Sequence, residues 1–343
     1  MRIAIVNDNL MAIEGLRRVV AMSRQHQIAW TAQDGHEAVQ RCAADCPDLI
    51  LMDLIMPGMD GVEATRQIMA HTPCAILIVT ASVDDRSALT FTAMGHGALD
   101  AVDLPQLGSG EPTASAQTLL NKISSLSRLL GERPSRSAAN VFGPADPRLP
   151  LVAIGASAGG PAAVSAILLD LPQDFAASVV IVQHVDERFA RGMADWLNGH
   201  SNLPVRLARE GDVPAAGEVL LAGTGDHLTL RRGGRIAYTA RPEDAIYRPS
   251  IDVFFRSICS SWQGPAVGLL LTGMGSDGAT GLKQLRDCGH HTIAQDSVTS
   301  AVFGMPKAAA ALSAAVDVLP LEAIAPRLVA LVTNTGTNGW RNI

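Results

Sequence analysis

The sequence predicts an α/β protein with two domains, and three observations support this prediction. Short apolar runs of strand length alternate with segments of helical spacing along most of the chain. The apolar runs are continuous rather than alternating, which is typical of parallel strands buried on both faces. The 343 residues suffice for two ordinary domains. The alternation stops once, at residues 131–149, which are rich in Pro, Gly, Ser and Arg and read as a linker.

The first domain, residues 1–130, contains five predicted strands separated by helix-like segments. The strands are expected at residues 2–6, 27–32, 48–53, 75–81 and 98–102. Helical spacing is clearest at residues 10–22 and 117–130, each with an apolar stripe. Five parallel strands with intervening helices predict a flavodoxin-like, doubly wound sheet.

The second domain, residues 150–343, resumes the same alternation after the linker. Strands are expected at residues 151–156, 177–184, 266–273 and 291–296, and helices at residues 253–262, 279–288 and 321–332. Residues 205–240 contain short strands divided by Gly-containing turns, which predict hairpins. We therefore expect a second doubly wound α/β domain with a β-hairpin insertion.

Charge and hydropathy exclude several classes of function. The net charge of −6 provides no basic surface for nucleic acid. The longest apolar runs, such as residues 266–271, are far shorter than the ~20 residues that span a bilayer. The N-terminal residues lack the apolar segment of a signal peptide. We expect a cytoplasmic protein that binds no nucleic acid and does not insert into a membrane.

The five cysteines are scattered, which does not suit a secreted disulfide framework. Cys42 and Cys46 can share one face of a helix, but no second pair of ligands stands nearby in the sequence. We interpret them as packing residues.

Acidic and hydroxyl side chains follow the strands of the first domain. Asp8 comes just after the first strand, Asp53 ends the third and Thr80 ends the fourth. The carboxyl ends of parallel strands share one edge of a sheet, so these side chains should converge. Two carboxylates with a backbone carbonyl suit Mg²⁺, and a carboxylate beside Mg²⁺ can attack phosphate. The alternative is that they are surface acids at strand ends.

The second domain opens with a strand that runs into the turn IGASAGG, residues 154–160. A Walker-type phosphate loop would need a Lys after the glycines, and a dinucleotide site would prefer G-x-G-x-x-G. Neither pattern is present, which leaves Ser157 as a candidate nucleophile. A Gly-rich turn that only packs tightly is the alternative.

Two further side chains lie at the same expected edge as Ser157. His184 ends the next strand, and Asp277 lies in the turn GMGSDG after the strand at 266–273. Ser, His and Asp together are the groups of nucleophilic acyl transfer. Their order in the chain differs from that of α/β-hydrolases. The glycines around Asp277 suit a turn whose N–H groups form an oxyanion hole.

Other histidines are weaker candidates for the base. None of them lies as clearly at the carboxyl end of a core strand: His227, His290 and His291.

The first domain resembles the receiver domains of response regulators. The resemblance rests on the segments MDLIMPGMDG at 52–61, VNDN at 6–9 and Thr80–Ala81. The resemblance implies that Asp53 is the phosphoacceptor and that Asp8, Asp53 and the carbonyl of Ile55 hold Mg²⁺. Thr80 corresponds to the switch hydroxyl.

This resemblance has two departures. Asn7 replaces one carboxylate of the acidic pair, and Leu104 stands where the family has a Lys before Pro105. Leucine cannot pair with a phosphoryl group, so weaker control by phosphorylation is expected.

The whole chain resembles the chemotaxis-type protein-glutamate methylesterases, the CheB family. The resemblance rests on the segments IGASAGG, IVQHV, YRPSID at 247–252 and LTGMGSDG. All four come after a receiver domain and a linker. The resemblance implies the triad Ser157, His184 and Asp277, with the N–H of Met274 in the oxyanion hole. Ala158 departs from the Thr that commonly follows the nucleophile.

The resemblance also implies substrates and partners. The expected substrate is a methyl-accepting chemoreceptor, with glutamine deamidation as a second expected activity, and the expected phosphodonor is a histidine kinase. With Asn7 and Leu104 in the receiver pocket, the chain resembles the Wsp-type, surface-sensing branch of the family.

Two other functions stay open at this point. One is a non-enzymatic adaptor that binds a receptor or kinase. The other is an esterase of small molecules built on the same scaffold.

Overall fold

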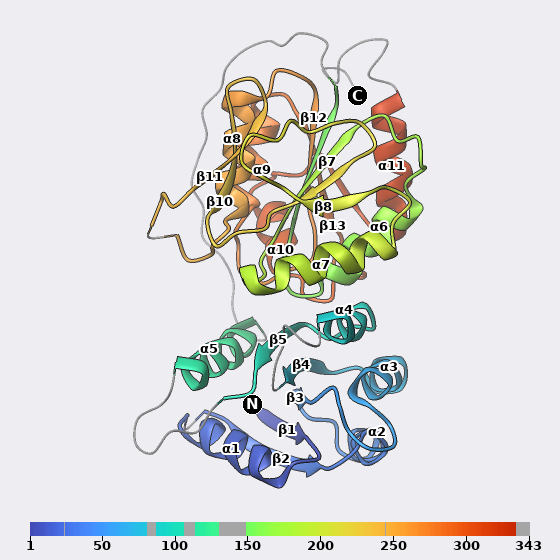
Figure 1. The fold of residues 1–343 in the computed structure, drawn as a ribbon, viewed down its shortest axis with the longest axis vertical. Coiled ribbons are helices and arrows are strands. Elements are labelled where there is room, and N and C mark those ends of the chain that lie inside the picture. The colour runs from blue at the N-terminus through green and yellow to red at the C-terminus, as the bar shows by residue number, and fades with distance from the viewer. Residues whose placement is uncertain (24, 81–86, 106–113, 130–148, 244, 334–343) are drawn as a thin grey trace. The chain divides into compact units, whose positions relative to one another are not determined.

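The structure is a computed structural model that describes residues 1–23, 25–80, 87–105, 114–129, 149–243 and 245–333 (Figure 1). The chain divides into two compact units, Met1–Glu132 and Arg133–Ile343. Ala81 and nearly all of the expected linker lie outside the described residues.

The first unit contains one parallel sheet of five strands in the order β2-β1-β3-β4-β5. The strands are β1 (Arg2–Val6), β2 (Gln27–Ala32), β3 (Leu49–Met52), β4 (Ala75–Thr80) and β5 (Asp100–Asp103). The helices are α1 (Leu10–Ala21), α2 (Gly35–Ala44), α3 (Gly61–His71), α4 (Ser87–Gly95) and α5 (Ala114–Leu129). The flavodoxin-like prediction is confirmed.

Local sequence explains where the first helices begin. Asn9, Asp34 and Asp60 precede α1, α2 and α3, and each side chain accepts a backbone N–H of the first turn. Helices α1 and α5 contact one another, as do α2, α3 and α4, and the two groups cover opposite faces of the sheet (Figure 1). Strand β3 is therefore buried along its whole length.

The second unit contains a seven-stranded sheet in the order β14-β13-β12-β6-β7-β9-β8, with every pairing parallel. The strands are β6 (Leu151–Ala156), β7 (Ser178–Gln183), β8 (Val205–Leu207), β9 (Val219–Leu221), β12 (Ala266–Leu270), β13 (His291–Gln295) and β14 (Asp317–Leu319). The chain runs outward from β6 in one direction and returns to add β12 on the other side. The point of reversal lies between β6 and β12, where α/β proteins place their sites.

Helices cover both faces of this sheet. They are α6 (Gly160–Asp170), α7 (Glu187–Gly199), α8 (Ile251–Ser261), α9 (Ala279–Asp287), α10 (Met305–Ala311) and α11 (Leu321–Thr333). Helices α8 and α9 pack together on one face, and α6 contacts α11 on the other (Figure 1).

The hairpin prediction for residues 205–240 is wrong in part. Only β10 (His227–Arg231) and β11 (Arg235–Thr239) form an antiparallel hairpin. Strands β8 and β9 instead pair in parallel with each other and extend the main sheet. Eleven residues separate them, which gives the chain room for a crossover that a tight turn does not allow.

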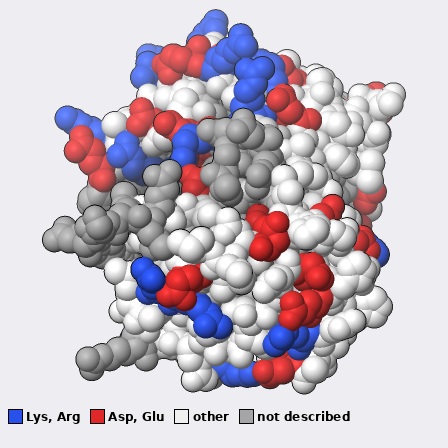
Figure 2. Space-filling model, turned by 60° about the horizontal axis from the view of Figure 1, so that its bottom comes forward, with Lys and Arg blue, Asp and Glu red and all other residues white. Residues whose placement is uncertain are grey.

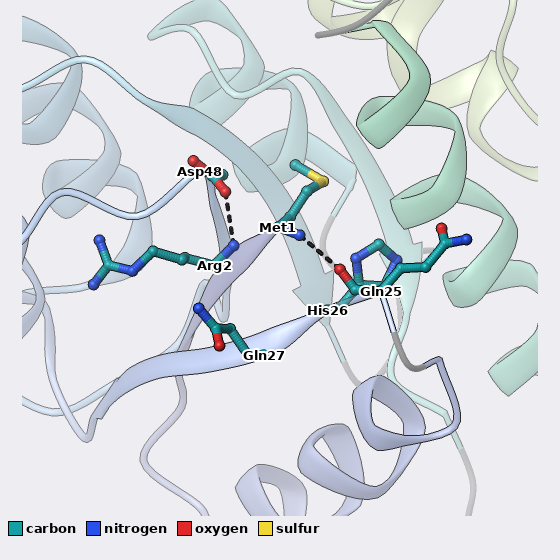
Figure 3. A pocket seen from close by; sticks show the side chains of 6 residues that line it. All are labelled: Met1, Arg2, Gln25, His26, Gln27 and Asp48. Atoms are coloured by element: carbon teal, nitrogen blue, oxygen red, sulfur yellow. Dashed lines mark hydrogen bonds between the residues drawn. The ribbon is translucent and has the colours of Figure 1, made fainter.

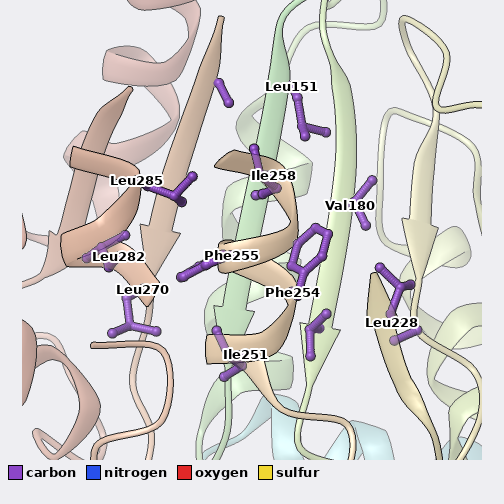
Figure 4. Packing of buried hydrophobic residues seen from close by; sticks show 14 of the residues in the cluster. Leu151, Val180, Leu228, Ile251, Phe254, Phe255, Ile258, Leu270, Leu282 and Leu285 are labelled. Atoms are coloured by element: carbon purple, nitrogen blue, oxygen red, sulfur yellow. The ribbon is translucent and has the colours of Figure 1, made fainter. Parts of the chain in front are cut away.

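A continuous apolar cluster holds α8 against the sheet. Phe254, Phe255 and Ile258 of α8 point between Val180 of β7 and Leu285 of α9 (Figure 4). Leu228 of the hairpin joins the same cluster, so the insertion is packed onto the core (Figure 4). This packing places the first turn of α8 near the carboxyl ends of β6 and β12.

Surface charge is mixed on the face that Figure 2 displays, where Lys and Arg lie among Asp and Glu. Among the described residues, no helix has the length and apolar character needed to cross a membrane.

Candidate active site

Ser157 follows β6 directly, in a turn whose backbone is held on several sides. Its N–H donates to the carbonyl of Thr272 at 3.1 Å. Its own carbonyl accepts from the N–H of Gly160 at 2.7 Å and from Nε2 of Gln183 at 2.8 Å. Gly159, with a φ of 73°, makes the turn into α6, and a Cβ there would lie 2.6 Å from Ala301. The serine is 9% exposed, in a turn with little freedom to move.

His184 follows the neighbouring strand β7 and lies beside the serine turn. Its N–H donates to the carbonyl of Ala156, the residue before Ser157, at 3.0 Å. Nε2 of the ring lies 2.8 Å from Oδ2 of Asp277. A carboxylate oxygen only accepts, so Nε2 carries the proton and Nδ1 is the basic nitrogen. Nδ1 is buried and has no hydrogen-bond partner among the described residues.

Asp277 is held at the N-terminus of α8. Its Oδ2 accepts from the N–H of Ile251 at 2.7 Å, and its Oδ1 accepts from Oγ of Ser250 at 2.9 Å and from the N–H of Asp252 at 3.1 Å. Burial by itself would raise the pKa of Asp277, but the hydrogen bonds from His184, Ile251 and Ser250 lower it below its usual value. The carboxylate is therefore ionised at neutral pH and orients the imidazole.

Tyr247 supports His184 from the side. The two rings are stacked with centroids 4.3 Å apart and an angle of 4° between their planes. Tyr247 opens the YRPSID segment, whose Ser250 also contacts Asp277. One short segment thus supports both His184 and Asp277.

The backbone before Met274 approaches the serine closely. A Cβ on Gly273 would lie 2.6 Å from Cβ of Ser157 and 2.4 Å from Sδ of Met305. Only glycine fits here, and the following N–H belongs to Met274, which is half-buried. This proximity is consistent with the expected oxyanion role of Met274.

The weaker histidine candidates have structural partners or lie elsewhere. Nδ1 of His227 accepts from the N–H of Ser250 at 3.0 Å, and its Nε2 donates to the carbonyl of Pro242 at 3.1 Å. His291 begins β13 and bonds Asp317, at the opposite end of the strand from the triad edge. Burial lowers the pKa of His290 to about 4.

Three supporting residues were missed by the sequence analysis. They are Gln183, Tyr247 and Ser250. Gln183 precedes His184 at a strand end, and the other two lie in a quoted motif, but no spacing rule predicts their contacts.

The receiver residues also meet at one sheet edge. Asp53 follows β3, is 8% exposed and donates its N–H to the carbonyl of Val6 at 2.9 Å. Nδ2 of Asn7 donates to Oδ2 of Asp53 at 2.9 Å, and Oδ1 of Asn7 accepts from the N–H of Asn9 at 2.8 Å. The amide is thus oriented by its neighbours and directs its N–H group at Asp53.

The other predicted receiver residues differ in exposure. Asp8 is exposed just beyond β1, and Ile55 is 47% exposed in the turn after Asp53. Thr80 is fully buried at the end of β4, and its carbonyl accepts from the N–H of Leu104 at 2.8 Å. Oxygen donors suitable for Mg²⁺ are present at this edge, although the Asn7 amide already engages one oxygen of Asp53.

A shallow polar pocket lies at the amino ends of strands β1, β2 and β3 of the receiver sheet, opposite to Asp53. Arg2, His26, Gln27 and Asp48 line it, together with Met1 and Gln25 (Figure 3). None of the candidate site residues contributes to it.

Comparisons with known proteins agree with this arrangement. A family model described as the CheB methylesterase matches residues 152–328, and one described as the response regulator receiver domain matches residues 3–105. The chain is 58% identical over 334 residues to protein-glutamate methylesterase/protein-glutamine glutaminase 4 of Burkholderia thailandensis, covering 97% of this chain and 98% of that protein. It is 58% identical over 330 residues to protein-glutamate methylesterase/protein-glutamine glutaminase 3 of Pseudomonas aeruginosa, covering 96% of this chain and 98% of that protein.

A solved structure supports the assignment of the second unit. The catalytic domain of the Thermotoga maritima CheB methylesterase is 32% identical, with a TM-score of 0.50, and covers 55% of this chain and 100% of that domain. The family resemblance drawn from the motifs is confirmed, whereas the Wsp-type branch stays a prediction. The chain belongs to the CheB family of response-regulator protein-glutamate methylesterases/protein-glutamine glutaminases.

Proposed function

We propose that Ser157, His184 and Asp277 hydrolyse the γ-methyl esters of glutamates on the cytoplasmic helices of a methyl-accepting chemoreceptor. The observation that carries this proposal is the 2.8 Å contact between Nε2 of His184 and Asp277, which leaves the buried Nδ1 unpartnered at the sheet edge that Ser157 shares. That nitrogen is available to a hydroxyl, as nucleophilic catalysis requires.

The reaction proceeds in two steps. Nδ1 of His184 takes the proton of Ser157 as Oγ attacks the ester carbonyl, and backbone N–H groups, including that of Met274, bind the oxyanion. Asp277 stabilises the imidazolium, which then gives its proton to the departing methoxide, so methanol leaves. Water attacks the acyl-enzyme by the same route and releases glutamate. A glutamine side chain reacts in the same way and releases ammonia.

The receiver supplies regulation in this proposal. A histidine kinase donates a phosphoryl group to Asp53, with Asp8, Asp53 and the carbonyl of Ile55 as ligands of Mg²⁺. When bound, Mg²⁺ would neutralise charge on the phosphoryl oxygens. Thr80 is the hydroxyl that senses the new group. Asn7 and Leu104 weaken this control, because neither provides the charge of the residue it replaces.

The test is methanol release from a methylated receptor fragment. Ser157→Ala should lower turnover by ~10⁴-fold or more with the fold intact. Wild-type turnover in that variant would exclude the mechanism. No release from the wild-type protein would favour the adaptor instead, and release only from small esters would favour a small-molecule esterase.

A second test addresses the expectation that the receiver acts as a gate, which lowers the activity of the second unit until Asp53 is phosphorylated. A small phosphodonor with Mg²⁺ should stimulate release by the wild-type protein and not by Asp53→Asn. Removal of residues 1–130 should raise basal activity, because it removes the unit that restrains the catalytic residues in this proposal. The second unit can be tested by itself, since it corresponds to a domain that was solved alone in the Thermotoga maritima relative. Unchanged activity after this deletion would contradict a gate.

A further inference from the structure

Three cysteines of the receiver unit come together although they are far apart in the sequence. Helix α2 ends at Ala44, so Cys42 lies in its last turn and Cys46 lies beyond it, in the segment before β3. Cys74 lies one residue before β4. The three sulfur atoms all lie within 4.8 Å of one another. Cys42 and Cys46 were interpreted as packing residues because the sequence does not show that Cys74 lies beside them.

The spacing of the sulfurs suits a metal ion. Sγ of Cys42 and Sγ of Cys74 are 3.9 Å apart. With metal–sulfur bonds of about 2.3 Å, two thiolates are about 3.8 Å apart in a tetrahedral site and about 4.0 Å apart in a trigonal one. The observed pair therefore needs little movement to hold an ion, and Cys46 can close the third position.

The surroundings suit a site that is buried on one side and open on the other. Cys42 is fully buried, Cys74 is half-buried and Cys46 is exposed. An ion can therefore enter from the Cys46 side. The hydroxyl of Thr72 donates to Sγ of Cys42 at 3.7 Å, which is a weak contact of the kind that orients a ligating sulfur.

We propose that Cys42, Cys46 and Cys74 form a three-thiolate site for a soft ion of the copper(I) class. Thiolates select soft ions, and no fourth His, Cys, Asp or Glu joins the cluster among the described residues. Zinc prefers four ligands and would have to add a water molecule. The site lies at the amino ends of β3 and β4, whereas Asp53 lies at their carboxyl ends.

Binding is coupled to proton release. Three S–H bonds break and three sulfur–metal bonds form, and three protons pass to the buffer with no change in oxidation state. The apparent affinity should therefore rise with pH.

The experiment is a titration of the reduced, full-length protein with copper(I), held in competition with a colorimetric chelator, without oxygen and with a non-thiol reductant. We expect one ion per chain at this cluster, with sulfur-to-metal charge-transfer absorption. Cys46→Ser should weaken binding by ~100-fold or more. Because Cys46 is exposed, its substitution leaves the core of the fold in place.

Two further variants complete the design. Cys74→Ser should have the same effect as Cys46→Ser. Cys288→Ser is the matched control, because its thiol interacts with Cys259 in the other unit and is remote in sequence from the cluster. Cys288→Ser should abolish any copper(I) binding by the Cys259–Cys288 pair. It should leave the tightly bound copper(I) at the three-cysteine cluster in place.

Several outcomes would overturn the proposal. Wild-type affinity in Cys46→Ser would mean that fewer than three thiols hold the ion. Loss of the tight ion in Cys288→Ser would place the binding in the other unit. Tighter binding of zinc than of copper(I), measured in a parallel titration, would exclude the copper class.

Discussion

Nε2 of His184 lies 2.8 Å from Oδ2 of Asp277, and the same carboxylate oxygen accepts the N–H of Ile251 at 2.7 Å. Asp277, which orients the His184 imidazole, is thus tied to the first turn of α8. Because Phe254 and Phe255 bury α8 in the core, the packing of this helix sets the position of the imidazole. The geometry of the proposed catalytic site is consequently linked to the stability of the second unit.

Loss of the Tyr247 ring should impair His184 while leaving the fold in place. Tyr247→Ala removes a stacked pair worth ~1 kcal/mol, so turnover should fall by roughly fivefold as the imidazole gains freedom. Tyr247→Phe keeps the ring and is the matched control. Methanol release at saturating substrate is the measurement, and equal loss in both variants would show that the hydroxyl matters instead.

A methyl group at Gly273 should block the site. The new Cβ would lie 2.6 Å from Cβ of Ser157, so Gly273→Ala must displace the serine turn or the Met274 peptide. We expect turnover to fall by ~10²-fold or more, since a misplaced oxyanion donor has an effect of that size. Gly199→Ala, where nothing lies within 4 Å of an added Cβ, is the control. Kinetics and circular dichroism of both variants provide the comparison.

The stability provided by Asp277 should depend on pH in the acid range. Its pKa in the folded protein is lower than the ordinary value of 3.8, because the hydrogen bonds outweigh the cost of burial. A lowered carboxyl pKa stabilises the fold at pH values above the unfolded pKa, and this contribution is lost as the pH falls through the folded pKa. The difference in unfolding free energy between wild type and Asp277→Asn should therefore be constant near about pH 5 and shrink below about pH 4.

Urea unfolding of both proteins across this range measures the difference. A gap that grows as the pH falls would contradict the assigned direction of the pKa shift.

Restoring a carboxylate beside Asp53 should strengthen the receiver metal site. Asn7→Asp exchanges an amide donor, 2.9 Å from Oδ2 of Asp53, for a second anionic oxygen. We expect Mg²⁺ to bind roughly tenfold more tightly, and the metal-free unit to be less stable because two carboxylates then face each other. Calorimetric titration with Mg²⁺ gives the affinity.

Asn9→Asp is the control for the Mg²⁺ experiment. It adds the same charge two residues away and keeps an N-cap for α1. An equal gain in both variants would show a general effect of charge rather than a ligand at position 7.

Much of the site could be predicted because parallel strands place their carboxyl ends at one edge. Ser157 and His184 follow β6 and β7, which pair residue by residue from Leu151 to Ala156, so their proximity follows from strand order alone. Asp277 follows β12, which pairs with β6 on its other side. The continuous apolar runs marked these strands, and the motifs marked the residues after them.

The remaining features depend on contacts between segments that no local pattern connects. The choice of Nδ1 as the base follows from the orientation of the His184 ring toward Asp277, which the fold alone determines. Glycine-containing segments beside β8 and β9 favoured a hairpin. The two strands instead pair in parallel, because β9 adds to β7 at the edge of the large sheet and β8 adds to β9. Cys74 reaches Cys42 because α2 packs against α3, and Cys74 follows three residues after α3 ends.

Periodicity and motifs therefore determined the two α/β domains, most of their strands and the three residues of the expected triad. The tertiary structure decided the supporting contacts of Tyr247 and Ser250, the basic nitrogen of His184 and the meeting of the three cysteines. The physical reason is that periodicity reports which face of an element is buried. Contacts at hydrogen-bond distance depend on how separate elements pack, and this is a property of the whole fold.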